Sequence, residues 1–151
     1  MRKMVLATLA VAMMASPAFA QTKYRFVIVP KAMNNPFFDV ARDGCLKRAK
    51  ELGNVECIYK GPIEHEPATQ AQIIQDFVTQ KVDGLAISVA DVAAMTKSIE
   101  AASAAGIPVV TFDADAPGSK RKAYIGTNNK DFGLALGKQL LQLRPGVAST
   151  P

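Results

Sequence analysis

The chain has 151 residues, of which 49% are apolar, and this is enough for one compact domain with a hydrophobic core. Its formal net charge of +5 comes from basic residues spread along the sequence, apart from a short run at residues 120–122. That run follows Pro117-Gly118 and is typical of a solvated turn, so composition and charge argue against a nucleic-acid-binding protein.

The first twenty residues are typical of a cleaved export signal. Arg2 and Lys3 precede an uncharged apolar stretch, and residues 16–20 end in the small-x-small pattern that signal peptidase requires. A membrane anchor is the alternative, but it needs about 20 continuous apolar residues, and Pro17 comes too early. We therefore expect cleavage after Ala20, a remaining net charge of +3, and a periplasmic protein that is not embedded in the membrane.

Strand-like and helix-like segments alternate along the rest of the chain. Residues 24–30 form an apolar run that predicts a first strand, and residues 36–52 have the periodicity of a helix that stops at Gly53. The apolar stripe of this helix should face a sheet, and it consists of Phe38, Ala41, Cys45, Ala49 and Leu52. Further strands are expected at 55–59, 84–89, 109–112 and 123–126, and further helices at about 67–80, between a cap at Asp91 and a stop at Gly106, and at about 130–143.

Repeated strand–helix units with short connections predict an α/β protein. Its sheet should be parallel and doubly wound, with helices on both faces. The continuous apolar run at 84–89 is expected to be buried on both faces of that sheet. Ligands of such sheets meet the loops at the carboxyl ends of the strands. Those loops are rich in hydrogen-bonding side chains here, and they cover residues 31–35, 61–66, 88–91, 113–115 and 127–129.

Residues 34–38 read Asn-Asn-Pro-Phe-Phe and lie where the first strand gives way to the first helix. One asparagine is expected to cap the helix, with Asn35 at the N-cap position, and the other could hydrogen-bond a polyhydroxylated ligand. Phe38 lies on the inner stripe and should pack into the core. Phe37 lies about 100° away and can offer its ring face to a sugar. In an exported protein this arrangement favours a binding protein over an enzyme.

Two aspartates follow the fourth strand. Asp113 stands where an open sheet presents a ligand-facing residue, and an ionised carboxylate binds hydroxyl groups strongly. Asp115 suits the chemistry of a turn before Pro117-Gly118. The two could also act as catalytic carboxylates, although nothing else in the chain supplies the cleft of a glycoside hydrolase.

The sequence contains few other signs of catalysis or metal binding. A dinucleotide-binding G-x-G-x-x-G, a phosphate-binding loop and a nucleophile elbow are all missing. The one histidine, His65, lies in a charged loop before Pro67, which is more typical of a solvated loop than of a metal ligand or a catalytic base. We therefore expect no enzyme activity, no metal and no cofactor.

The two cysteines, Cys45 and Cys57, are expected on the first helix and on the strand that follows it. An even number of cysteines in an exported chain favours one disulfide, and the packing of that helix beside that strand would permit it. Two buried free thiols remain the alternative.

Four motifs resemble the periplasmic sugar-binding proteins of bacterial ABC importers, the ribose- and galactose-type group with the type I periplasmic binding protein fold. They are residues 34–38, 82–88 (VDGLAIS), 106–113 (GIPVVTFD) and 124–128 (YIGTN). The resemblance extends from Tyr24 to about Leu143. Repressors of the lactose type share this fold but begin with a DNA-reading helix-turn-helix, whereas this chain begins with the export signal.

The resemblance implies a two-lobed protein that closes over a monosaccharide or related polyol and delivers it to the membrane permease of an ABC importer. The alternatives are a binding protein that hands its ligand to a membrane sensor, and a secreted carbohydrate-active enzyme that uses Asp113. The ligand-binding residues that the resemblance implies are Lys31, Asn35, Phe37, Phe38, Ser88, Asp113, Thr127 and Asn128.

Three departures from the family pattern accompany this resemblance. Ala114 follows Asp113 where ribose-binding members commonly have an arginine, and Lys31 stands where a small polar residue is usual, so another monosaccharide, a sugar alcohol or an acidic sugar would fit. Family members also run to roughly twice this length. We therefore expect a fragment, in which residues 21–127 form the N-terminal lobe and residues 128–151 hold the hinge crossing and the first helix of an otherwise absent second lobe.

Overall fold

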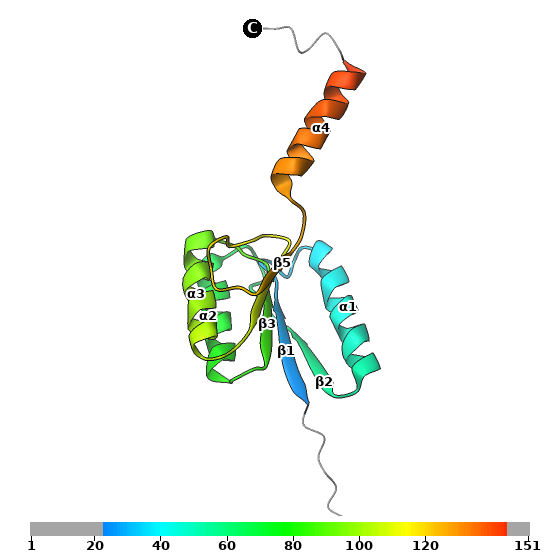
Figure 1. Cartoon of the computed structure of the whole chain (residues 1–151). Coiled ribbons are helices and arrows are strands. Elements are labelled where there is room, and N and C mark those ends of the chain that lie inside the picture. Colours follow the sequence, from blue (N-terminus) through cyan, green and yellow to red (C-terminus); the bar gives the residue numbers. More distant parts are fainter. Residues whose placement is uncertain (1–22, 145–151) are drawn as a thin grey trace, which may run out of the picture.

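The computed structural model describes residues 23–144, so the predicted export signal and the tail after Arg144 lie outside the described part of the chain. Each predicted strand and helix is present, with ends that differ from the prediction by one or two residues. The elements in chain order are β1 (Tyr24–Val29), α1 (Phe37–Leu52), β2 (Val55–Tyr59), α2 (Pro67–Thr79), β3 (Gly84–Ile87), α3 (Val92–Ala104), β4 (Val109–Phe112), β5 (Ala123–Ile125) and α4 (Asn129–Leu143) (Figure 1).

The five strands form one parallel sheet in the order β2-β1-β3-β4-β5. Helix α1 covers one face of this sheet, and α2 and α3 cover the other (Figure 1). The structure therefore confirms the predicted doubly wound α/β fold. Because the strand order reverses direction beside β1, the chain leaves β1 and β3 toward opposite faces, and a crevice opens at their carboxyl ends.

The helix ends follow local chemistry that the sequence partly predicts. The Asp91 carboxylate accepts a hydrogen bond from the Ala94 N–H at 2.8 Å and caps α3, as predicted. At the start of α1 the N-cap position belongs to Pro36 and not to Asn35. The Asn35 side chain nevertheless accepts a hydrogen bond from the Phe37 N–H at 3.0 Å, so it still satisfies one of the free N–H groups of the first turn.

The face covered by α2 and α3 holds the hydrophobic core. Alternate side chains of the three central strands point into this layer and are almost fully buried. The two helices contribute a matching set at helical spacing. This core includes Val27, Val29, Ile74, Phe77, Leu85, Ile87, Met95, Ile99 and Val109.

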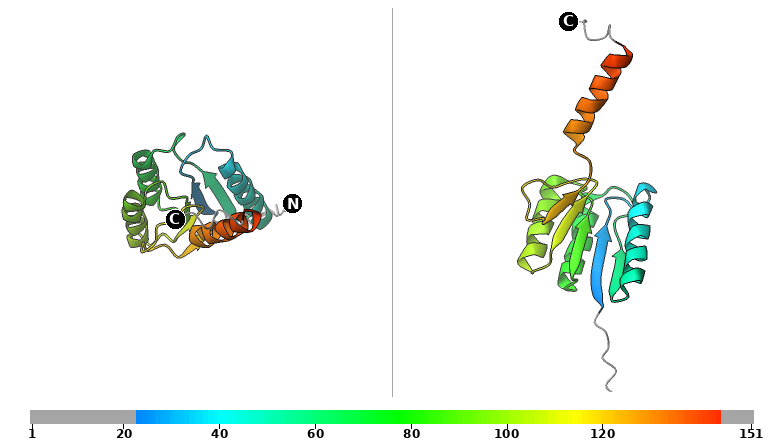
Figure 2. Two further views of the ribbon diagram at one scale, coloured as in Figure 1. Left: turned by 90° about the horizontal axis from the view of Figure 1, so that it is seen from above. Right: turned by 45° about the vertical axis from the view of Figure 1, so that its right-hand side comes forward.

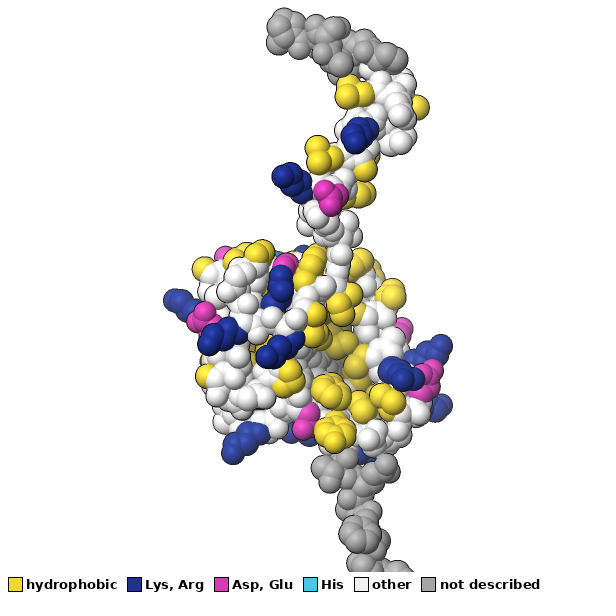
Figure 3. All heavy atoms as spheres, in the orientation of Figure 1, with side chains coloured by type: hydrophobic (Ala, Val, Ile, Leu, Met, Phe, Trp, Pro, Cys, Tyr) yellow, Lys and Arg dark blue, Asp and Glu magenta, His cyan; other side chains and the backbone are white. Residues whose placement is uncertain are grey.

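The face covered by α1 is much more open. Helix α1 buries only Phe38 and Ala49, and Leu52, which was predicted to face the sheet, is 46% exposed. The prediction that β3 is buried on both faces is also only partly correct, because Ala86 is half-buried. A helix about 10 Å across covers only about two strands spaced roughly 4.8 Å apart. Figure 3 shows the resulting hollow, which is lined with hydrophobic side chains between the sheet and α1.

A disulfide joins Cys45 on α1 to Cys57 on β2, with the two Cα atoms 6.0 Å apart. This is the pairing that the sequence favoured over two free thiols. The bond ties the middle of α1 to the edge strand of the sheet. It therefore secures the helix that has the fewest buried side chains of the three helices packed on the sheet.

Helix α4 projects away from the carboxyl ends of the strands (Figures 1 and 2). None of its residues is buried, and Phe132, Leu136 and Leu140 are at least half exposed. Across residues 23–144, each helix is too short or too polar to cross a membrane.

Candidate ligand-binding site

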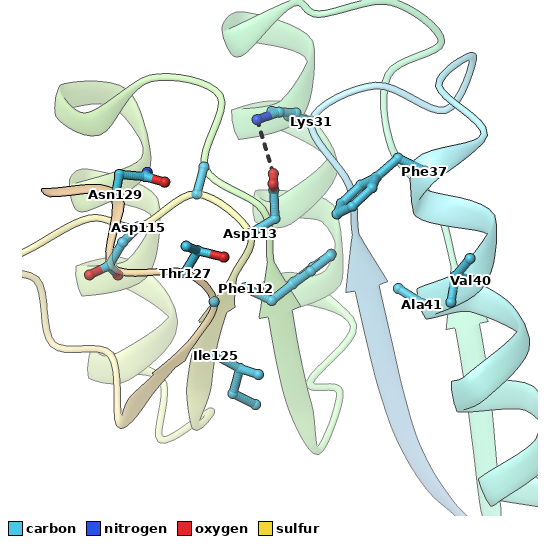
Figure 4. A pocket seen from close by; sticks show the side chains of 12 residues that line it. Lys31, Phe37, Val40, Ala41, Phe112, Asp113, Asp115, Ile125, Thr127 and Asn129 are labelled. Atoms are coloured by element: carbon cyan, nitrogen blue, oxygen red, sulfur yellow. Dashed lines mark ion pairs between the residues drawn. The ribbon is translucent and has the colours of Figure 1, made fainter. Parts of the chain in front are cut away.

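A cavity of about 650 Å³ lies at the carboxyl ends of the strands, between the start of α1, the loop after β4 and the segment after β5 (Figure 4). One side of it is apolar and comes from α1, β4 and β5, and the other side is polar. The lining residues are Lys31, Phe37, Val40, Ala41, Phe112, Asp113, Ala114, Asp115, Ile125, Gly126, Thr127 and Asn129.

Asp113 stands at the centre of the polar side and has an unusual backbone. Its φ of 59° lies in the left-handed region, which costs a residue with a Cβ about 1–2 kcal/mol. The Ala114 N–H donates to the Phe112 carbonyl at 2.6 Å, so the chain reverses sharply at Asp113. Outliers of this kind persist where surrounding contacts enforce them, and they are common at ligand sites.

Two side chains hold the Asp113 carboxylate through the same oxygen. The Ser88 hydroxyl donates to Oδ2 at 2.8 Å, and the Lys31 ammonium lies 2.9 Å from Oδ2 (Figure 4 shows the ion pair). Ser88 is fully buried and does not line the cavity. In this structure it therefore orients the carboxylate, while a direct ligand contact by Ser88 stays a prediction.

Tyr124 holds the backbone of the same turn, a role that was not predicted from the sequence. Its hydroxyl lies 2.9 Å from the Asp113 carbonyl oxygen and 3.2 Å from that of Thr127. A Cβ at Gly126 would overlap the Tyr124 side chain, so the glycine is what makes room for this contact. In the sequence, the only indication of this role was the glycine two residues after Tyr124 in the YIGTN motif.

Three phenylalanines build the aromatic part of the site. Phe37 is 60% exposed and its ring lies at the cavity mouth (Figure 4), whereas Phe38 is 1% exposed. The rings meet edge to face, with centroids 5.2 Å apart for Phe37 and Phe38 and 6.1 Å apart for Phe38 and Phe112. The structure thus gives Phe37 the exposed position that the sequence predicted and Phe38 a supporting one. Phe112 lines the cavity and was missed, although its place beside Asp113 was a signal.

Gln70 is a third missed residue, and it joins the two strand ends at the crevice. It is fully buried on α2, and its amide nitrogen lies 3.2 Å from the carbonyl oxygen of Pro30 and 2.7 Å from that of Ser88. Its amide oxygen accepts a hydrogen bond from the Ala90 N–H at 3.1 Å. Gln70 precedes the buried Ile74 by one helical turn. Its position as a polar residue on the apolar stripe of α2 could have indicated a structural role.

Asp115 forms an ion pair with Arg121 in the loop between β4 and β5. Arg121 Nη2 donates to Asp115 Oδ2 at 2.7 Å, and the Thr111 hydroxyl donates to Oδ1 at 2.6 Å. The Arg121 guanidinium holds the pKa of the Asp115 carboxyl below its usual value, with a smaller contribution from Thr111. The prediction of a solvated basic run at 120–122 is therefore wrong for Arg121, because this residue is half-buried and paired.

The other predicted ligand residues lie at the edge of the site. Thr127 lines the cavity, but Asn35 and Asn128 do not. The Asn128 side chain accepts from the N–H groups of Lys130 and Asp131 at 3.2 and 3.3 Å, so it caps α4 much as Asn35 serves α1. Ligand contacts by these two asparagines stay predictions. Residues 23–144 hold no group of three or more His, Cys, Asp or Glu side chains that could bind a metal ion.

An α/β domain whose crevice at the switch point of the sheet combines aromatic rings with a carboxylate belongs to the class of ligand-binding lobes. A family model described as the periplasmic binding protein domain matches residues 26–149, and the chain therefore belongs to that family. This confirms the resemblance found in the sequence. The curated relatives are named as binding proteins, which agrees with the expectation from the sequence that this chain is not an enzyme.

Individual relatives show the same likeness. The ribose import binding protein RbsB of Bacillus subtilis is 30% identical over 150 residues, which cover 90% of this chain and 48% of the relative. The solved structure of GanP, a glucose-galactose binding protein from Geobacillus stearothermophilus, is 35% identical with a TM-score of 0.77 over 82% of this chain and 44% of GanP. A XylFII–LytSN complex matches with 30% identity and a TM-score of 0.74 over 81% of this chain and 44% of the matched chain. The chain thus spans about half the length of these relatives.

Proposed function

We propose that this chain forms the N-terminal wall of a periplasmic solute-binding protein that captures a monosaccharide or related polyol for an ABC importer. The observation that carries the proposal is the pairing of opposite chemistries across one cavity. The exposed Phe37 ring provides a flat apolar surface, and Asp113 with Lys31 provides charged hydrogen-bonding groups opposite it. A sugar ring has the matching combination of an apolar C–H face and a rim of hydroxyl groups.

The relatives support this assignment. Their names record import of ribose and binding of glucose and galactose, and the similarity includes the region of this chain that lines the cavity. We infer that the protein is exported to the periplasm and that its membrane partner is a permease of the same importer. Export would use residues 1–20 as the cleaved signal.

The exposed position of α4 supports the proposed domain division. Its apolar residues, such as Leu140 and Leu143, have no cover within the described chain. We propose that residues 21–127 form one lobe and that residues 128–151 cross into a second. Because a single lobe contacts a ligand from one side only, we expect the isolated chain to bind sugars with millimolar or weaker affinity.

The direct test is a nuclear magnetic resonance titration of the ¹⁵N-labelled chain with D-ribose, D-glucose and D-galactose. We expect chemical-shift changes at Phe37, Asp113 and Thr127 for at least one sugar. The affinity obtained from these changes should be about tenfold weaker for Phe37→Ala. Asp76→Ala on α2 is the control, because Asp76 is exposed and lies on the face opposite α1. Absence of binding by every sugar, or shifts confined to α2 and α3, would contradict the proposal.

A second candidate is a binding protein that passes its ligand signal to another protein instead of a permease. The similarity to the XylFII–LytSN complex favours it, because that relative was solved bound to a second protein. Both candidates require the same sugar site. They are distinguished by co-purification of the protein from its host, with a permease in one case and with a different membrane protein in the other.

A further inference from the structure

We propose that the Lys31–Asp113 ion pair selects a neutral sugar or polyol with two adjacent hydroxyl groups, and that the Asp113 carboxylate is the group that disfavours an acidic ligand. This inference rests on the proposed sugar-binding function and narrows its ligand class. Its basis is the charge balance of the cavity and the way in which Lys31 and Asp113 share their hydrogen-bonding groups.

The charges that line the cavity cancel within the protein. Three described lining residues are ionised, namely Lys31, Asp113 and Asp115. Lys31 is paired with Asp113 at 2.9 Å, and Asp115 is paired with Arg121. Among the described lining residues, no cation is left to pair with a ligand carboxylate. An acidic sugar would therefore lose hydration of its charge on entry and gain no new counterion.

The shared oxygen of Asp113 determines what the pair can still bind. Ser88 and Lys31 both approach Oδ2, and within the described residues Oδ1 accepts no hydrogen bond. An ammonium group has three N–H donors, and the ion pair with Asp113 needs only one of them. The pair therefore offers a charged donor next to a charged acceptor, both facing the cavity.

Two adjacent hydroxyl groups match this arrangement. One hydroxyl can accept from Lys31 while its neighbour donates to Asp113 Oδ1, and both hydrogen bonds are strengthened by charge. A carboxylate can only accept, so it would meet Lys31 favourably and repel Asp113. Because the two paired side chains are only 29% and 25% exposed, solvent screens this repulsion less than it would at an open surface.

The surroundings keep the pair in place. Lys31 lies above the ring of the buried Phe38, with its nitrogen 6.0 Å from the ring centroid. Ser88 and the reversed backbone at Asp113 fix the carboxylate from the other side. Lys31 therefore reaches the ligand space as part of a neutral unit and not as an isolated cation.

Matched ligands test the charge selection. D-Galactose and D-galacturonate share the ring stereochemistry and differ in a carboxylate that replaces the hydroxymethyl group, and D-galacturonamide is the uncharged control for its size. D-Glucose and D-glucuronate form a second pair. We would titrate the ¹⁵N-labelled full chain to about 100 mM ligand, which is sufficient for millimolar dissociation constants. We expect the neutral sugar and the amide to bind at least about tenfold more tightly than the acid.

Three variants assign the selection to the pair. Asp113→Asn leaves Lys31 without its partner, so it should weaken neutral sugars and shift the acid-to-neutral affinity ratio toward the acid by about tenfold or more. Lys31→Met leaves the Asp113 carboxylate alone and should shift that ratio further against the acid. The double variant removes both charges and should bring the ratio of acid to amide close to one. Signal dispersion in the same spectra shows whether each variant is folded.

The outcomes separate this inference from the proposed function. Equal binding of acid and neutral sugar by the wild-type chain, or an unchanged ratio in a folded Asp113→Asn variant, would overturn the charge selection while leaving sugar binding intact. Absence of binding by every ligand would overturn both. If Asp113→Asn does not fold, the wild-type comparison of acid, amide and neutral sugar still decides the question.

Discussion

The two faces of the sheet hold their helices by different means. On one face, α2 and α3 are fixed by a continuous layer of buried aliphatic side chains such as Ile74, Met95 and Ile99. On the other, α1 buries two residues and is tied to β2 by a disulfide. The open face is also the one that supplies Phe37 to the candidate site. In this domain, burial on one face provides the stability, and the other face keeps apolar surface available for contacts.

The largest expected effect tests the difference in packing between the faces. Ile99→Ala removes a fully buried side chain from α3 and should lower the free energy of unfolding by about 2–5 kcal/mol. Leu46→Ala on α1 is the matched change, and because Leu46 is 47% exposed it should cost less than about 1 kcal/mol. Urea denaturation of both variants measures the difference. Equal losses would show that the two faces are packed alike.

A smaller but still large effect is expected from the disulfide. Replacing both cysteines with serine removes a cross-link between residues 12 apart in sequence. This should lower the free energy of unfolding by about 2–4 kcal/mol. Reductant should destabilise the wild-type chain by a similar amount and leave the Cys45→Ser/Cys57→Ser variant unchanged. If the free energy of unfolding falls by less than about 0.5 kcal/mol, packing alone holds α1 on the sheet, and the proposed difference between the two faces is wrong.

The smallest expected effect concerns the Arg121–Asp115 ion pair in the loop between β4 and β5. Because Arg121 lowers the pKa of Asp115 in the folded state, the pair stabilises the fold above the unfolded pKa of about 3.9, and this contribution is lost as the pH falls through the folded pKa. The stability gap between wild type and Asp115→Asn should therefore be largest near neutral pH and shrink in acid. Urea denaturation across this pH range measures the gap. Arg121→Gln should reduce the same pH dependence, and a gap that widens in acid would contradict this account.

The order of elements and the position of the crevice could be predicted from the sequence. Helical and strand periodicities are set by neighbours within a few residues, and the change from one to the other marks each loop. The rule that ligands meet strand ends then pointed to Asp113, and helical geometry separated an exposed Phe37 from a buried Phe38. Each of these steps uses only local spacing or general topology.

The supporting contacts of the site could not be predicted in this way. Ser88 was expected to be a ligand residue, but its depth in the sheet directs its hydroxyl to Asp113. Gln70 and Tyr124 received no role, because their partners depend on which strand ends come together. Only the packed structure places Pro30 within reach of Gln70, 40 residues further along the chain.

The sequence by itself determined the class of fold, the strand ends that carry ligand-facing groups and the resemblance to periplasmic sugar-binding proteins. Tertiary structure alone decided that Lys31 pairs with Asp113, that Arg121 pairs with Asp115 and that Leu52 stays exposed. The physical reason is range. Propensity and periodicity act between near neighbours, whereas ion pairing and burial depend on distances that exist only after the sheet and its layers have formed.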